Sequence, residues 1–108
     1  IKELQRYTIQ KKDIIDLRQN YSWDIANETL YRFNEEVALT PKEKKLLRLL
    51  LSVLDKTFTY EEISIYVWGY EETGSQDSIK TLVKKIRKKL PEGLIENIFA
   101  TGFKINLS

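Results

Sequence analysis

The sequence predicts an α+β domain in which four short strands come first, three helices follow, and a β-hairpin closes the chain. Three observations support this class. Short aromatic and β-branched segments separated by asparagines fill residues 14–39, segments with helical periodicity and capping residues follow, and residues 95–107 alternate around a Thr-Gly turn. The 108 residues and the 42% hydrophobic composition are enough for one domain with its own core.

Four segments near the start are predicted to be strands, because aromatic and β-branched residues dominate them. They are Ile14–Leu17, Tyr21–Asp24, Leu30–Phe33 and Val37–Leu39. Gln19-Asn20, Ala26-Asn27 and Asn34-Glu35 lie between them and favour turns, so an antiparallel meander is expected. We expect its aromatic residues to pack the meander against the first helix rather than to bind a ligand; they are Tyr21, Trp23, Tyr31 and Phe33.

Two capping boxes mark the starts of the first two helices. Thr40 and Glu43 surround a proline that suits the first helical position, and leucines at helical spacing predict a buried helix ending near Asp55-Lys56. Thr59 and Glu62 form the second box, and the helix that they open should end around Trp68-Gly69. In the first helix, the side chains expected to face inward are Leu46, Leu47, Leu50 and Leu54, and the apolar face is widened by Leu49, Leu51 and Val53. In the second helix, they are Ile63, Tyr66, Val67 and Trp68. Between the two helices, Phe58 is expected to make a brief strand contact.

The third helix and the closing hairpin follow a polar loop. Ser75 can cap a helix over residues 75–90, which Pro91 and Gly93 then break. Its apolar residues form one narrow stripe: Ile79, Val83, Ile86 and Leu90. From Ile95 to Leu107 the chain alternates around Ala100-Thr101-Gly102, which predicts a two-stranded hairpin.

Positive charge is concentrated on the third helix. Residues 75–90 carry a net charge of +5, residues 1–74 sum to −2 and residues 91–108 to −1, which gives +2 for the chain. The helix holds Lys80, Lys84, Lys85, Arg87, Lys88 and Lys89 against Asp77. Such a distribution is typical of a nucleic-acid-binding element. An ordinary solvated helix face is the alternative, and the charge alone does not decide between the two.

The phase of the third helix places its cations opposite its apolar stripe. At about 100° per residue, Thr81, Lys84, Lys85, Lys88 and Asp77 fall within roughly 60° of the pole opposite Ile79, whereas Lys80, Arg87 and Lys89 lie on the flanks. Such a helix fits a major groove, where central side chains reach base edges and flanking ones reach phosphates. The two preceding helices and the hairpin after it favour a winged helix-turn-helix with the hairpin as the wing.

The composition excludes several other function classes. The chain has no cysteine and no histidine, which removes disulfides, the usual zinc sites, thiol nucleophiles and imidazole bases. No triad, phosphate loop or recognisable carboxylate pair is present, so we predict no enzyme activity, metal or cofactor. The acidic residues of the second helix and the following loop, Glu61, Glu62, Glu71 and Glu72, lack metal-ligand spacing and are expected to be a solvated face.

The chain also lacks a secretion or membrane signal. No apolar run approaches the roughly 18 residues of a membrane span and no signal-peptide pattern opens the sequence, so a cytoplasmic protein without membrane contact is expected. Methionine is absent even at position 1. We therefore expect the chain to be a piece of a longer protein.

In order and spacing, several of these segments resemble the C-terminal effector domain of OmpR/PhoB-type response regulators, a family of bacterial transcription factors. The segments are Leu39–Glu43 with Leu46-Leu47, Thr59–Ile63 running to Val67-Trp68, Ile79–Leu90, and Ile98–Lys104 around Thr101-Gly102-Phe103. The resemblance covers residues 14–108, which are expected to be the winged-helix domain. Residues 1–13 then resemble the end of an upstream receiver helix and a linker.

The resemblance implies a transcription factor that binds double-stranded DNA at tandem direct repeats, usually as a homodimer, under the control of an upstream receiver domain. The loop 69–74 matches a segment that contacts RNA polymerase in some members. Lys85 occupies a base-contacting position, and Lys84 and Arg87 match phosphate-contacting positions. Lysine lacks the bidentate fork of arginine, so Lys85 should discriminate modestly among bases. The alternatives are a winged-helix protein-interaction module and a nonspecific nucleic-acid binder.

Two positions depart from the family. Asp77 replaces a frequent basic residue, and it either accepts from a cytosine amine or favours the positive helix N-terminus, which is the option we prefer. Phe99 and Ala100 replace an Arg-Gly pair whose arginine enters the minor groove. Phe99 is either packed in the core, which we prefer, or an apolar minor-groove contact. Three more hairpin residues are predicted to contact DNA: Asn97 and Thr101 at phosphate or base, and Lys104 at the backbone.

Overall fold

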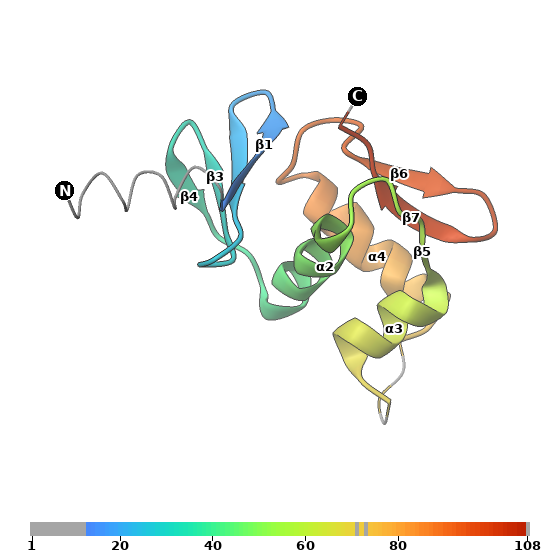
Figure 1. Cartoon of the computed structure of the whole chain (residues 1–108). Helices are drawn as coiled ribbons and strands as arrows, with labels where there is room; N and C mark the ends of the chain where they lie inside the picture. The colour runs from blue at the N-terminus through green and yellow to red at the C-terminus, as the bar shows by residue number, and fades with distance from the viewer. Residues whose placement is uncertain (1–12, 71, 73, 108) are drawn as a thin grey trace. The chain divides into compact units, whose positions relative to one another are not determined.

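The computed structural model describes residues 13–70, 72 and 74–107, and these residues form two compact units. The first unit ends at Ala38 and the second begins at Leu39. Four strands come first, three helices follow with a short strand between the first two, and two strands close the chain (Figure 1). This order confirms the predicted fold class. The predicted upstream helix and linker lie, apart from residue 13, outside the described residues.

The first unit is a four-stranded antiparallel meander whose strands pair in chain order. The strands are β1 (Ile14–Arg18), β2 (Tyr21–Asp24), β3 (Thr29–Arg32) and β4 (Glu35–Val37). Tyr21 and Trp23 alternate along β2 and both are buried, as are Leu17 and Leu30 on the neighbouring strands. The alternation gives β2 one apolar face, as the sequence pattern predicted.

The last hairpin of the meander corrects two predicted strand ends. β3 ends at Arg32, and the loop consists of Phe33 and Asn34, which both have positive φ (52° and 65°). Two such residues match the twist of antiparallel strands, so the chain turns here and β4 begins at Glu35 instead of Val37. Phe33 is 61% exposed beneath the Arg32 guanidinium, 5.5 Å from its ring centroid. Our expectation that Phe33 packs in the core was wrong.

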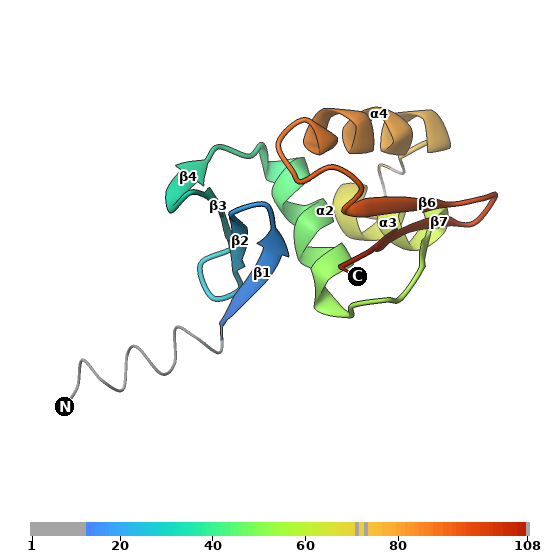
Figure 2. The same ribbon diagram turned by 90° about the horizontal axis from the view of Figure 1, so that it is seen from above.

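The second unit combines three helices with a three-stranded antiparallel sheet in the order β5-β7-β6 (Figures 1 and 2). Its elements are α2 (Pro41–Ser52), β5 (Phe58–Thr59), α3 (Tyr60–Trp68), α4 (Gln76–Arg87), β6 (Ile95–Ile98) and β7 (Gly102–Ile105). Both predicted capping boxes are formed, and the Ser75 hydroxyl accepts the Ser78 N–H at the start of α4. The apolar stripes of the helices are buried, including Leu46, Leu47, Leu50, Ile63, Val67, Ile79, Val83 and Ile86.

The helix α2 ends earlier than predicted, at Ser52 rather than near Asp55. Val53 already has an extended backbone (φ −137°), and Asp55 turns the chain with φ 68°. Because the helical phase is lost, Val53 and Leu54 are 51% and 44% exposed instead of facing inward. On α3, Tyr66 is likewise exposed rather than inward-facing.

The helix α4 also ends early, at Arg87 rather than Leu90. The N–H groups of Lys88, Lys89 and Leu90 donate to carbonyls three residues earlier, which tightens the last turn. The cause lies in Pro91, since a proline disfavours the α conformation in the residue before it. Leu90 nevertheless remains buried, as its place in the apolar stripe predicted.

Candidate nucleic-acid interface

The two faces of α4 differ as the helical phase predicted. The residues of its apolar stripe are buried, together with Leu82, which is 8% exposed and which our prediction had left out. Leu82 lies three residues after Ile79, so helical periodicity was a signal that could have found it. Thr81, Lys84 and Lys85 are exposed, and Lys88 is exposed directly after the helix. The helix and its C-cap residue therefore offer three ammonium groups and a hydroxyl to solvent.

The Arg87 side chain, by contrast, is held by the protein itself. Its Nη2 donates to the carbonyl oxygen of Ile95 on β6 at 2.8 Å. Its guanidinium carbon also lies 5.8 Å from the ring centroid of Phe103 on β7. Arg87 therefore joins the C-terminal end of α4 to the sheet. The residue remains exposed, so it can still approach a phosphate, but its Nη2 is already committed to β6.

Lys89 is held in a similar way by Glu43. The two side chains form an ion pair with 2.7 Å between Nζ and Oε1, and the Glu43 side chain is almost completely buried. Burial alone would raise the pKa of the Glu43 carboxyl, but the hydrogen bond from Lys89, the backbone N–H of Thr40 and the lysine charge together lower that pKa below its ordinary value of 4.5. The charge of Lys89 is therefore neutralised inside the domain, where it joins the end of α4 to the start of α2.

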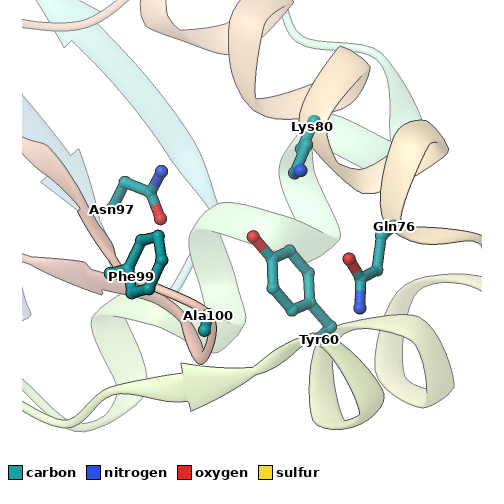
Figure 3. A pocket seen from close by; sticks show the side chains of 6 residues that line it. All are labelled: Tyr60, Gln76, Lys80, Asn97, Phe99 and Ala100. Carbon is teal, nitrogen blue, oxygen red and sulfur yellow. The ribbon is translucent and has the colours of Figure 1, made fainter.

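A cleft of about 400 Å³ lies between the N-terminal end of α4 and the tip of the β6–β7 hairpin (Figure 3). It is lined by Tyr60, Gln76, Lys80, Asn97, Phe99 and Ala100. The Tyr60 ring lies between the helix residues and the hairpin residues, and its hydroxyl points into the cleft (Figure 3). The sequence had singled out Lys80, Asn97 and Phe99. It gave no signal for Tyr60 and Gln76, because only the tertiary fold brings the start of α3 beside the hairpin.

The hairpin tip corrects our interpretation of Phe99. Its side chain is 92% exposed, so the preferred prediction of core packing was wrong. The strands end at Ile98 and Gly102, and residues between them form a turn in which Ala100 has φ 58° and the Thr101 N–H donates to the Ile98 carbonyl. A side chain in such a turn projects beyond the sheet and has no core to enter.

The remaining predicted site residues divide between the hairpin and the start of α4. Asn97 and Thr101 are exposed, and the Thr101 hydroxyl donates to the Phe99 carbonyl at 3.2 Å. Lys104 lies half-buried on β7 opposite Glu96. Asp77 is exposed in the first turn of α4, where its carboxylate interacts favourably with the positive end of the helix dipole.

In the loop before α4, Gly74 makes two contacts with α3. The Gly74 N–H donates to the buried Ser64 hydroxyl at 2.8 Å, and Gly74 lies against the half-buried Trp68 ring. The Lys42 ammonium lies 5.8 Å from that ring centroid. Tyr70 is 81% exposed, whereas residues 71 and 73 of the predicted polymerase-contacting loop lie outside the described residues. Over the residues described, no helix is long and apolar enough to cross a bilayer.

The helix pair α3–α4 followed by the β6–β7 hairpin defines a winged helix-turn-helix, the architecture of a DNA-binding domain. Residues 34–105 match the family model described as "Transcriptional regulatory protein, C terminal". The chain therefore belongs to this family of bacterial OmpR/PhoB-type DNA-binding domains, which confirms the resemblance inferred from the sequence. Residues 34–105 therefore form a DNA-binding domain of this family.

Individual relatives agree with the family assignment. The chain is 37% identical over 73 residues to the regulatory protein VanRB of Enterococcus faecalis, covering 68% of this chain and 33% of VanRB. It is 34% identical over 86 residues to the transcriptional regulatory protein VxrB of Vibrio cholerae, covering 80% of this chain and 35% of VxrB. The chain thus spans about a third of the length of these relatives. Among solved structures, the DNA-binding domain of Bacillus subtilis CssR superposes with a TM-score of 0.70 at 29% identity, covering 80% of this chain and 99% of that one.

Proposed function

We propose that this domain binds double-stranded DNA sequence-specifically, with α4 in the major groove. The observation that carries the proposal is the exposed face of α4, where Thr81, Lys84, Lys85 and Lys88 lie opposite a fully buried apolar stripe. Thr81 is assigned to a base edge because it lies near the centre of that face, and Lys85 because it matches a base-contacting position of the family. Lys84 and Lys88 are assigned to phosphates.

Residues beside this face are assigned supporting contacts with the DNA backbone. Lys80 and Asn97 border the cleft, and Thr101 and Lys104 lie on the hairpin. Arg87 is assigned a secondary phosphate contact, since its Nη2 already donates to Ile95. Lysine-based contacts to phosphate make binding depend on salt, and each neutralised phosphate contributes about 0.9 to the slope of log affinity against log salt concentration.

The wider assignment follows from the family. We propose that the chain acts in the cytoplasm as the effector domain of a longer regulator whose upstream receiver domain controls it. Binding to tandem direct repeats by a homodimer, and contact with RNA polymerase through the loop 69–74, belong to the same proposal. The length of the relatives supports it, because this chain matches only about a third of them.

The test uses duplexes that the 108-residue chain retains from a random pool, with a scrambled duplex of equal length beside them. Lys85→Ala should weaken binding to the selected duplex about tenfold and leave the scrambled duplex almost unchanged, in line with one lost base contact. Lys84→Ala should weaken both duplexes alike. Equal weakening of both by Lys85→Ala would make Lys85 a phosphate contact and overturn its assignment to a base edge, whereas equal affinity of the wild-type chain for both duplexes would make the domain a nonspecific binder. No binding of any duplex at low salt would leave only a protein-interaction role.

A further inference from the structure

The residue ahead of the cap of α4 is held by a side chain buried inside α3. In the part of the chain that the structure describes, two polar side chains other than aromatic ones are buried: Glu43, 2% exposed, and Ser64, 6% exposed. Burying a hydroxyl costs free energy unless it is hydrogen-bonded, and a serine inside a helix usually bonds to its own helix. The Ser64 hydroxyl accepts the Gly74 N–H at 2.8 Å, ten positions further along the chain. Ser64 thus connects α3 to the chain just ahead of α4.

The Trp68 ring, at the end of α3, lies directly against Gly74. A Cβ added to Gly74 would lie 2.5 Å from Cε3 of the ring and 2.6 Å from Cδ2, so any larger residue would displace either the ring or the chain beside it. Gly74 does not have a positive φ. The close approach of the ring, and not the backbone conformation, therefore requires glycine at this position.

These two contacts fix the chain at the point where α4 begins. Ser75 follows Gly74 directly and is the N-cap of the helix, so the contacts act just outside its first turn. Beyond the other end of the helix, Lys89 pairs with the second buried polar side chain, Glu43. Each of the two buried polar side chains therefore holds the chain just outside one end of α4, and together they set its angle and depth. A reading element needs such support, because its side chains must keep their geometry to within about 0.5 Å.

We propose that Ser64 and Gly74 are positioning residues for sequence reading: they hold the start of α4 where Thr81 and Lys85 meet base edges. The proposal rests on the proposed function, because it requires α4 to lie in the major groove. Neither residue is assigned a contact with DNA, and both act through the helix. Contacts to phosphate orient a protein without reading sequence, and flexible lysines can follow a small displacement of the helix. A displaced α4 should therefore lose discrimination between sequences while it keeps most of its nonspecific affinity.

The first experiment separates positioning from stability. Affinities for the selected and the scrambled duplex are measured for Ser64→Ala and Gly74→Ala at a temperature where urea denaturation shows each variant to be folded. Both should weaken binding to the selected duplex about fivefold and leave the scrambled duplex within about twofold, because part of a base contact is lost. Ile63→Val is the matched control: it removes a buried methyl group from the same helix, and it should lower the stability but keep the discrimination. Unaltered discrimination in Ser64→Ala and Gly74→Ala, or an equal loss in Ile63→Val, would overturn the proposal.

The second experiment tests whether Ser64 acts through the reading face. Lys85→Ala is measured on the selected duplex in the wild-type chain and again in Ser64→Ala. If Ser64 positions Lys85, the second substitution should cost only about twofold in Ser64→Ala instead of about tenfold, because the contact is already impaired. Full additivity of the two substitutions would overturn the positioning role. If the wild-type chain still prefers the selected duplex and Lys85→Ala removes that preference, such a failure concerns Ser64 and Gly74 alone, and the proposed function stands.

Discussion

The exposed face of α4 and its C-terminal end use the same kind of residue for different purposes. Lys84, Lys85 and Lys88 lie on the face opposite the core, with their ammonium groups in solvent. Arg87 and Lys89 belong to the same cationic run, but they bind the carbonyl of Ile95 and the carboxylate of Glu43. The net charge of a helix therefore overstates its capacity to neutralise phosphates.

The internal contacts of the C-terminal end give the exposed face a fixed direction. Arg87 joins α4 to β6, whereas Lys89 joins it to the capping box of α2. The helix is thus held by two different elements just after the turn that carries Lys84 and Lys85. Substitutions should therefore have different effects in the two groups. Changing Arg87 or Lys89 should lower the stability, whereas changing Lys84, Lys85 or Lys88 should lower the salt dependence of DNA binding.

The largest effect is expected from Gly102→Ala, which displaces the hairpin that holds Arg87. A Cβ at Gly102 would lie 1.8 Å from the carbonyl oxygen of Phe58, so β7 would have to separate from β5. We expect a loss of about 3–5 kcal/mol of unfolding free energy, measured by urea denaturation. Gly93→Ala is the control: a Cβ there meets nothing within 4 Å, and only the positive φ of 79° is strained, at a cost of about 1 kcal/mol. Equal losses in the two variants would contradict the close approach of the strands.

Lys89→Met tests whether Lys89 stabilises the fold instead of binding DNA. Removing the ammonium leaves a buried carboxylate without its counter-charge, and we expect a loss of about 2–3 kcal/mol in stability, reduced from the value for a fully buried pair because Lys89 is 34% exposed. The salt slope of DNA binding should stay the same. Lys88→Met, one residue away and exposed, should leave the stability unchanged and lower the slope by about 0.9. A reversed pattern would show that the assignment of the two lysines is wrong.

The pH dependence of the unfolding free energy in the acid range provides a third test. The pKa of Glu43 is lowered in the folded domain, so its stabilising contribution is complete above the unfolded value near 4.5 and is lost as the pH falls through the lower folded pKa. Glu43→Gln should therefore be less stable than the wild type at neutral pH, and the difference should shrink under acid conditions. Urea denaturation at several pH values measures it. Glu62→Gln is the control, since its more exposed carboxylate should give a smaller change of the same sign. A difference that persists below the folded pKa would contradict the role of the ion pair.

The sequence predicted the helix starts and the two faces of α4 because these features depend on local rules. Thr40, Thr59 and Ser75 cap their helices through residues three positions ahead, and helical periodicity alone placed Ile79, Val83 and Ile86 inside. The overall α+β order followed from the same local signals. The order of helices and hairpin indicated the wing, and the resemblance to a known family supplied its expected contacts with DNA.

What the sequence could not predict depends on contacts between distant residues. The Lys89–Glu43 pair spans 46 positions, so helical phase could place Lys89 on the flank of the helix but could not identify its partner. The cleft required the start of α3 to meet the hairpin, so Tyr60 gave no signal. Phe33 and Phe99 misled for another reason: aromatic residues favour strands, but both lie in turns, where backbone geometry exposes them.

The smallest expected effect concerns the N-terminal end of α4, which borders the cleft. This end is not held by contacts like those of Arg87 and Lys89 at the C-terminal end. The Ser75 hydroxyl accepts the Ser78 N–H at 3.1 Å, and Ser75→Ala should cost about 1 kcal/mol of stability. Ser78→Ala is the matched control, because it keeps the capping N–H and should be nearly neutral, whereas Ser75→Asp should retain the cap. Since Gln76 and Lys80 lie in the first turns of the helix, fraying in Ser75→Ala should also weaken DNA binding slightly, and thermal unfolding and titration of the selected duplex together measure both. A loss of stability in Ser75→Ala without any loss of affinity would show that the first turn of α4 is not needed for binding, and would confine recognition to the lysines of its exposed face.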